Sequence, residues 1–108
     1  MSREIGAEAE RKAREFLQKE GFEIVEQNLF SRFGEIDIIA LRGEVLHFIE
    51  VKSGKNFNPI YAITPKKLEK IKKTIGFYLM QNAIDRDYCI SAVCLQGEEI
   101  TFLENINF

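Results

Sequence analysis

Hydrophobic and polar positions follow two different periods along this chain, and the changes of period predict its elements. Over residues 3–20 the apolar side chains recur every three or four positions, which is typical of an amphipathic helix, and Gly21 follows as a left-handed cap. The buried stripe of this helix is expected to be Ile5, Ala9, Ala13, Phe16 and Leu17. A second helix is expected after Thr64 and Pro65, a favourable N-cap and a favourable first helical residue. Its buried stripe is expected to be Leu68, Ile71, Ile75, Tyr78 and Leu79.

Short runs of β-branched and aliphatic residues predict five strands, at residues 22–29, 35–41, 45–51, 88–95 and 98–103. Polar breaks at 42–44 and 96–97 contain glycine and predict hairpin turns. Residues 54–63 form a polar loop that is a candidate substrate-contacting flap. The order α-β-β-β-α-β-β predicts one α/β domain over residues 1–108, with a mixed sheet flanked by the two helices.

The central hairpin, residues 34–52, carries ionisable side chains among apolar ones. Strict alternation would put Glu35 and Asp37 on one side of its first strand, and Glu50 and Lys52 on one side of its second. A buried carboxylate needs an opposite charge, hydrogen bonds or a metal to offset its desolvation, and neighbouring carboxylates favour Mg²⁺ or Mn²⁺. An ion pair between Glu50 and Lys52 on a solvated face, with Asp37 as an ordinary edge charge, explains the same spacing.

The hairpin motif resembles a known nuclease signature. Asp37, Glu50 and Lys52 resemble the PD-(D/E)xK pattern, with GEID at 34–37 followed by EVK at 50–52. Nearly the whole chain resembles the YraN family, a bacterial family related to archaeal-type Holliday junction resolvases. Besides the two motifs, this resemblance rests on Gly6, Glu10, Ala13, Leu17, Gly21, Asn28 and Lys67. The chain departs from the usual family pattern at Gly54, where arginine is usual, and at Ser91, where aspartate is usual.

The resemblance implies a restriction-endonuclease-like fold and metal-dependent hydrolysis of phosphodiester bonds in DNA, including branched or junction DNA. Asp37 and Glu50, with the backbone carbonyl of Val51, would hold Mg²⁺ or Mn²⁺, and Lys52 would orient the attacking water or stabilise added charge on the phosphate. Glu10 and Glu35 would support a second ion or position the first. The helical pattern alone slightly favours another explanation of Glu10, a charge at the flank of the helix that pairs with Arg14 or Arg3.

Charge is distributed unevenly, although the net charge is only −2. Residues 51–84 carry seven lysines and one acid, and this block begins beside the hairpin motif. A solvated helix face would explain such a block, but next to carboxylates it is also a candidate path for phosphates. The candidate phosphate contacts are Lys55, Lys66, Lys67, Lys70 and Arg32.

The sequence supports two classes of function above a third. One is the nuclease, and the other is a nucleic-acid-binding module that keeps the fold and the lysines without cleaving. A sugar hydrolase built on the carboxylate pair is less well supported because it needs no lysine block.

Composition narrows the setting of the protein. No apolar run approaches the roughly 20 residues of a membrane span, and we expect a cytoplasmic protein that binds DNA and no membrane; homodimer formation is left open. Cys89 and Cys94 should point to opposite faces of one strand and act as buried small hydrophobes. His47 has the opposite parity to Glu50 and is expected to be a packing residue.

Overall fold

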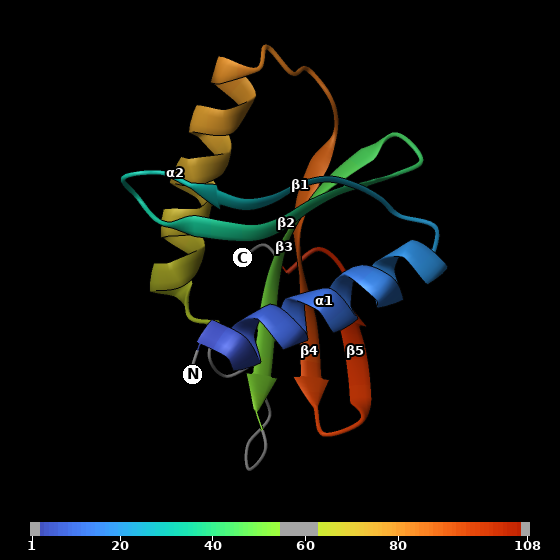
Figure 1. The fold of residues 1–108 in the computed structure, drawn as a ribbon. Coiled ribbons are helices and arrows are strands. Elements are labelled where there is room, and N and C mark those ends of the chain that lie inside the picture. The colour runs from blue at the N-terminus through green and yellow to red at the C-terminus, as the bar shows by residue number, and fades with distance from the viewer. Residues whose placement is uncertain (1–2, 55–62, 107–108) are drawn as a thin grey trace.

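A computed structural model describes residues 3–54 and 63–106, which form a five-stranded sheet and two helices (Figure 1). The elements are α1 (Arg3–Lys19), β1 (Glu23–Phe30), β2 (Glu35–Arg42), β3 (Val45–Gly54), α2 (Pro65–Gln81), β4 (Tyr88–Gln96) and β5 (Glu99–Leu103). The predicted order α-β-β-β-α-β-β is therefore confirmed. The predicted flap lies outside the described residues, apart from its two end positions.

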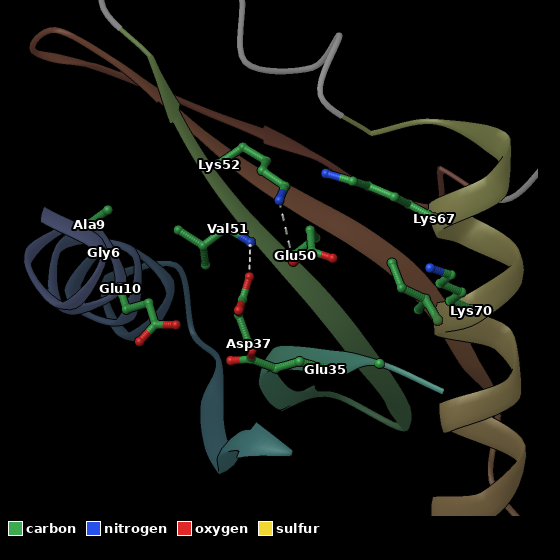
Figure 2. Close-up of a pocket in the computed structure, with 12 residues that line it drawn as sticks. Gly6, Ala9, Glu10, Glu35, Asp37, Glu50, Val51, Lys52, Lys67 and Lys70 are labelled. Atoms are coloured by element: carbon green, nitrogen blue, oxygen red, sulfur yellow. Dashed lines mark hydrogen bonds and ion pairs between the residues drawn. The ribbon is translucent and has the colours of Figure 1, made fainter. Parts of the chain in front are cut away.

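The strands lie in the order in which they occur in the chain, from β1 at one edge to β5 at the other. The pairs β1–β2, β2–β3 and β4–β5 are antiparallel, whereas β3 and β4 are parallel. A parallel pair needs a long crossover, and α2 lies in the segment that connects β3 to β4. This crossover brings the lysine-rich N-terminal part of α2 close to the C-terminal end of β3 (Figure 2).

The two helices cover opposite faces of the sheet and complete two apolar cores. On the first face Ala9, Ala13 and Leu17 of α1 pack with Ile38, Ile49 and neighbouring strand residues. On the second face Leu68, Ile71, Ile75 and Tyr78 of α2 pack with Ile39, Phe48 and Ile90. The predicted stripe of α2 and that of α1 from Ala9 onward are thus largely buried, while the side chain of Ile5 lies outside the described part of the chain. The central strands β2 to β4 supply side chains to both cores.

The helix ends form where the sequence predicts them. Gly21 follows α1 with φ of +90°, a conformation that glycine adopts without steric cost, and the N–H of Phe22 donates to the carbonyl of Leu17 at 2.9 Å. At the start of α2 the Thr64 hydroxyl accepts a hydrogen bond from the N–H of Lys67 at 3.2 Å, and Pro65 is the first helical residue. Such a cap contributes about 1 kcal/mol and fixes where the helical lysines begin.

Strict alternation fails at more than one place: the register of β1 shifts between Ile24 and Glu26, and the faces of β2 change next to Asp37, which corrects their prediction. Ile36 and Ile39 both pack in the α2-side core, whereas Ile38 packs in the α1-side core. Asn28, the residue of β1 nearest this break, has φ of 52°, which reorients the backbone. Glu35 therefore does not share a face with Ile39, as a period of two would require.

Two smaller predictions are confirmed. His47 is only 2% exposed, its ring packs edge-on against Phe22 with 4.9 Å between ring centres, and its Nδ1 lies 3.0 Å from the Ser91 hydroxyl. Cys89 and Cys94 are both buried and unbridged. Among the residues that the structure describes, neither helix is long and apolar enough to cross a membrane.

Candidate active site

An open cleft of about 370 Å³ lies at the end of the sheet where α1, β2, β3 and α2 approach one another. Four acids line it, one from α1 and three from the central hairpin, and three lysines line it from β3 and α2. The acids are Glu10, Glu35, Asp37 and Glu50, and the lysines are Lys52, Lys67 and Lys70. Figure 2 shows how these side chains converge on the cleft from separate elements.

Three of the acids form a cluster, which we call the acid cluster: Glu10, Glu35 and Asp37. One carboxylate oxygen from each lies within 4.8 Å of the others. Glu10 reaches the cluster from α1, and Glu35 points to the same side of the sheet because the face of β2 changes after Ile36. The helix position of Glu10, at the border of the apolar stripe, therefore places it at the cleft.

The acid cluster has a neutral hydrogen-bond donor at its edge, a feature that sequence patterns alone did not single out. With Nδ2 turned toward the acids, the Asn28 amide donates to Glu10 Oε1 at 3.1 Å and to Glu35 Oε1 at 3.2 Å. The opposite orientation would set the amide oxygen against two carboxylate acceptors, which is unfavourable. In the sequence, only the resemblance to the YraN family indicated Asn28, as an asparagine that precedes the GEID motif.

Strands β2 and β3 separate at the cleft. Their register runs from Arg42↔Val45 to Ile38↔Ile49, and it stops before the acids. Beyond that point the backbone N–H of Val51 donates to Asp37 Oδ2 at 2.8 Å instead of to a strand carbonyl (Figure 2). In the gap between the strands, Asp37 is thus held by a backbone N–H of β3.

Glu50 lies beside the acid cluster but is not one of its three members. Its side chain is 12% exposed, and Lys52 Nζ lies 4.0 Å from Glu50 Oε1. The sequence predicted Asp37 and Glu50 as the central carboxylate pair, whereas the three oxygens that meet in the described residues come from Asp37, Glu10 and Glu35. Asp37 is the carboxylate common to both groups.

The pKa shifts in the cleft reflect an excess of negative charge on partly buried side chains. Burial, together with the hydrogen bond and charge of Asp37, raises the pKa of Glu50 to about 9. Burial and the neighbouring carboxylates also raise the pKa values of Glu10 and Glu35. On the other side, the Lys52 ammonium lowers the pKa of Lys67, and partial burial adds to this effect. Acids that hold protons this strongly gain most from a cation placed between them.

The remaining candidate residues differ in their relation to the cleft. Lys67 and Lys70 line it, whereas Lys66 is an exposed residue of α2 outside its lining. Arg32 lies on the turn between β1 and β2, with its guanidinium 4.9 Å from the centre of the Phe33 ring. Lys55 lies outside the described residues.

The two positions that depart from the usual family pattern have different surroundings. Ser91 is fully buried, and its hydroxyl lies close to His47 and accepts from the N–H of Asn105 at 3.3 Å. It does not line the cleft. Gly54 is the last residue of β3, two positions beyond Lys52.

The donor set suits a hard divalent cation. Carboxylate oxygens within a few ångströms of one another are the ligands that Mg²⁺ and Mn²⁺ take in proteins, while thiolates and imidazoles favour softer metals. Both cysteines are buried in β4 away from the cleft, and His47 is directed to Ser91. The residues at the cleft therefore fit Mg²⁺ or Mn²⁺.

The fold matches that of a solved structure. Hjc of Archaeoglobus fulgidus, described as a Holliday junction resolvase from an archaeal hyperthermophile, superposes with a TM-score of 0.59 at 19% sequence identity. The match covers 88% of this chain and 72% of that chain. The mixed sheet and its two helices thus define a restriction-endonuclease-like fold, as the sequence predicted.

The chain itself belongs to the Uncharacterised protein family UPF0102, whose model matches residues 9–95. This confirms the resemblance to the YraN family. A UPF0102 protein of Helicobacter pylori strain HPAG1 is 59% identical over 103 residues, which are 95% of this chain and 90% of that protein. A UPF0102 protein of Wolinella succinogenes is 53% identical over 106 residues, which are 98% of each.

Proposed function

We propose that this protein is a nuclease that uses Mg²⁺ or Mn²⁺ to hydrolyse phosphodiester bonds of DNA, including branched or junction DNA. One observation carries the proposal. Four acids and three lysines, contributed by α1, β2, β3 and α2, meet in a single open cleft. Glu50 is 12% exposed with a pKa raised to about 9, and it lies beside three acids whose oxygens come within 4.8 Å of one another, an arrangement that a cation would stabilise. The fold shared with Hjc adds support.

The acids have the role of holding the cation. Asp37 is the shared ligand, with Glu50 on its β3 side and with Glu10 and Glu35 on its α1 side. The N–H and the C=O of a residue in an extended strand point to the same side, so the carbonyl of Val51 would face the gap into which its N–H donates. A divalent cation held there lowers the pKa of a bound water and polarises the scissile phosphate.

The lysines act on the phosphate and on the water. Lys52 is the residue we assign to chemistry, because it shares the cleft with Asp37 and lies beside Glu50. Its ammonium would orient the attacking water or stabilise the charge that develops on the phosphate. Lys67 and Lys70 would bind neighbouring phosphates as point charges from the start of α2.

A rival function on the same fold is a nucleic-acid-binding module that does not cleave, since a fold does not fix an activity. The lysines and Arg32 would serve this function equally well. The four acids would not, because negative charge next to the phosphate path weakens binding unless a cation neutralises it. The acid cluster therefore favours the nuclease.

The test compares cleavage with binding for wild type and Lys52→Ala. Nicking is followed on gels with Mg²⁺ or Mn²⁺, using duplex, single-stranded and branched DNA, and binding is titrated in Ca²⁺ to suppress the chemistry. We expect Lys52→Ala to lose about 100-fold or more in cleavage, on the scale of one lost transition-state donor, and to bind within a few-fold of wild type. Lys72→Ala is the matched control, because Lys72 pairs with Glu69 at 3.7 Å and does not line the cleft.

Wild-type protein that binds these DNAs but nicks none of them with either metal would reject the nuclease. If Lys52→Ala then behaved like wild type in binding as well, the binding module would take its place.

A further inference from the structure

Phe30, the last residue of β1, is 69% exposed and lies at the edge of the acid cluster. It is the register partner of Glu35 on β2. Directly opposed residues on antiparallel strands have side chains within about 5.5 Å at Cβ and on the same face. The preceding residue, Leu29, packs in the α2-side core, so Phe30 points to the opposite face, where Glu35 meets Glu10.

A single exposed phenylalanine is common on protein surfaces and needs no special explanation. The surroundings of Phe30 distinguish it from that ordinary case. Its cross-strand neighbour belongs to the acid cluster, and the turn that follows it is tightly fixed. A large apolar ring on an open sheet edge beside charged groups costs solubility, so a binding role is the more economical explanation.

The turn after Phe30 is held against α2 by hydrogen bonds. The N–H of Ser31 donates to the carbonyl of Gly34 at 2.8 Å, and the Ser31 hydroxyl accepts from the N–H of Phe33 at 3.0 Å. The same hydroxyl lies 2.8 Å from the buried Thr74 hydroxyl of α2. Phe30 therefore precedes a well-defined turn, and little backbone entropy would be lost when a ligand contacts it.

The turn is also basic. Arg32 lies over the Phe33 ring at 4.9 Å, and Lys73 of α2 approaches the same ring at 5.8 Å. Lys70, one helical turn before Lys73, lines the cleft. In the described part of the chain, no ion pair engages any of these three cations. An anionic strand that leaves the cleft along the turn would thus find cations on α2 and on the turn, and an aromatic ring on β1.

We propose that Phe30 is a stacking platform for an unpaired base adjacent to the cleft, so that the preferred substrate is single-stranded DNA or duplex DNA with an unpaired arm. Bases inside a duplex already stack on their neighbours, and a protein ring at the site can stack only on a base that is free. The proposal rests on the proposed function for the identity of the cleft, but its test measures binding and needs no cleavage. A protein partner is the less favoured occupant because Phe30 opposes Glu35 of the acid cluster and the turn that follows it carries Arg32, a setting that suits a phosphate backbone with a bound cation.

The experiment uses two DNAs with the same duplex sequence. One is a blunt duplex, and the other also carries a single-stranded arm with the fluorescent base 2-aminopurine beside the junction. Wild type, Phe30→Leu and Phe30→Tyr are titrated in Ca²⁺. A stacked base is worth about 1–3 kcal/mol, so Phe30→Leu should weaken binding of the armed DNA by about fivefold or more and remove the quenching of 2-aminopurine. Phe30→Tyr keeps the ring and should bind the armed DNA within about twofold of wild type. All three proteins should bind the blunt duplex with the same affinity.

Tyr88→Leu is the matched control, because Tyr88 is an exposed aromatic residue, 47% exposed, at the opposite end of the β3–β4 pair, next to Leu46. It should bind both DNAs as wild type does, and thermal unfolding should show that all variants are folded. Equal loss on both DNAs, or no loss on either, would overturn the proposal. So would a wild-type dimer that Phe30→Leu dissociates without changing the preference for the arm, because Phe30 would then belong to an interface between copies. A wild-type protein that never nicks DNA would reject the proposed hydrolysis and leave this binding result standing.

Discussion

The carboxylate of Asp37 accepts a 2.8 Å hydrogen bond from the backbone N–H of Val51, across a gap in which β2 and β3 no longer pair. The bond fixes one oxygen of Asp37 on the rigid backbone of a central strand. Because Asp37 also lines the cleft, its carboxylate is presented to a ligand at a defined place. A carboxylate positioned by a main-chain donor is better preorganised for a ligand than one held by a flexible side chain.

Glu50→Gln should make the metal-free protein more stable at neutral and alkaline pH. The pKa of Glu50 is raised from 4.5 to about 9, so the folded protein holds a proton that the unfolded chain releases above pH 4.5. The free energy of unfolding therefore falls between about pH 4.5 and pH 9, and glutamine removes this loss. The gain at pH 8 should be on the order of 2 kcal/mol, measured by urea unfolding in EDTA. Glu44→Gln, in the exposed hairpin turn, is the control. Parallel pH profiles for wild type and Glu50→Gln would contradict the assignment.

Asp37→Asn should weaken Mn²⁺ binding by about tenfold or more while the fold is kept. The amide oxygen of asparagine can still accept from Val51, but a charged ligand shared by both groups of acids is lost. Calorimetric titration gives the affinity. Glu8→Gln on the exposed face of α1, where Glu8 pairs with Arg11, removes the same charge at a distance and should leave the affinity within about twofold. Equal Mn²⁺ affinity in Asp37→Asn and wild type would mean that Asp37 is not a ligand.

Asn28 allows its side chain and its backbone to be tested separately. Asn28→Gly keeps the residue free to adopt φ of 52° but removes the amide that donates to Glu10 and Glu35. We expect about tenfold weaker Mn²⁺ binding, the scale of a lost outer hydrogen bond to metal ligands. Asn28→Ala should show this loss together with lower stability, because alanine disfavours a positive φ. Wild-type Mn²⁺ affinity in Asn28→Gly would restrict Asn28 to a backbone role.

The lysines of α2 should contribute unequally to DNA binding. Lys67 and Lys70 line the cleft and Lys66 does not, so alanine at the first two positions should shallow the logarithmic salt slope by up to about 0.9 each on duplex DNA. Lys66→Ala should change the slope less. The slopes come from binding titrations in Ca²⁺ at several salt concentrations. An unchanged slope in the Lys67→Ala, Lys70→Ala double variant would place the phosphate path on another surface.

The sequence predicted what depends on local chemistry. Thr64 and Pro65 start α2 because the Thr64 hydroxyl caps it and the fixed φ of proline suits the first helical position, and the lysines after them follow by helical spacing. The central hairpin followed from its apolar runs and its Gly43 turn. Lys52, Lys67 and Lys70 could be named as a group because β3 and α2 are neighbours in the chain. These features need only a few residues of context.

The faces of the acids could not be predicted, because they depend on a break in the strands. A period of two holds only while the backbone stays regular, and the positive φ of Asn28 changes the faces next to Asp37. The pattern also cannot show where two paired strands separate. The sequence grouped Asp37 with Glu50, and the folded chain places both at the cleft and adds Glu35 and the helical Glu10 beside Asp37.

Glu10 is the one described residue of the acid cluster that does not belong to the hairpin, and this links the site to the docking of α1. A cation bound jointly by Glu10 and the strand acids would link the helix to the sheet. If it binds only when the helix is docked, its binding free energy also stabilises the docked helix. Amide hydrogens of α1 should then exchange more slowly in the presence of Mn²⁺, whereas those of β5, remote from the cleft, should exchange at an unchanged rate. Binding of the ion would thus make α1 more ordered, and the exchange rate of its amide hydrogens would measure the fraction of sites that hold an ion.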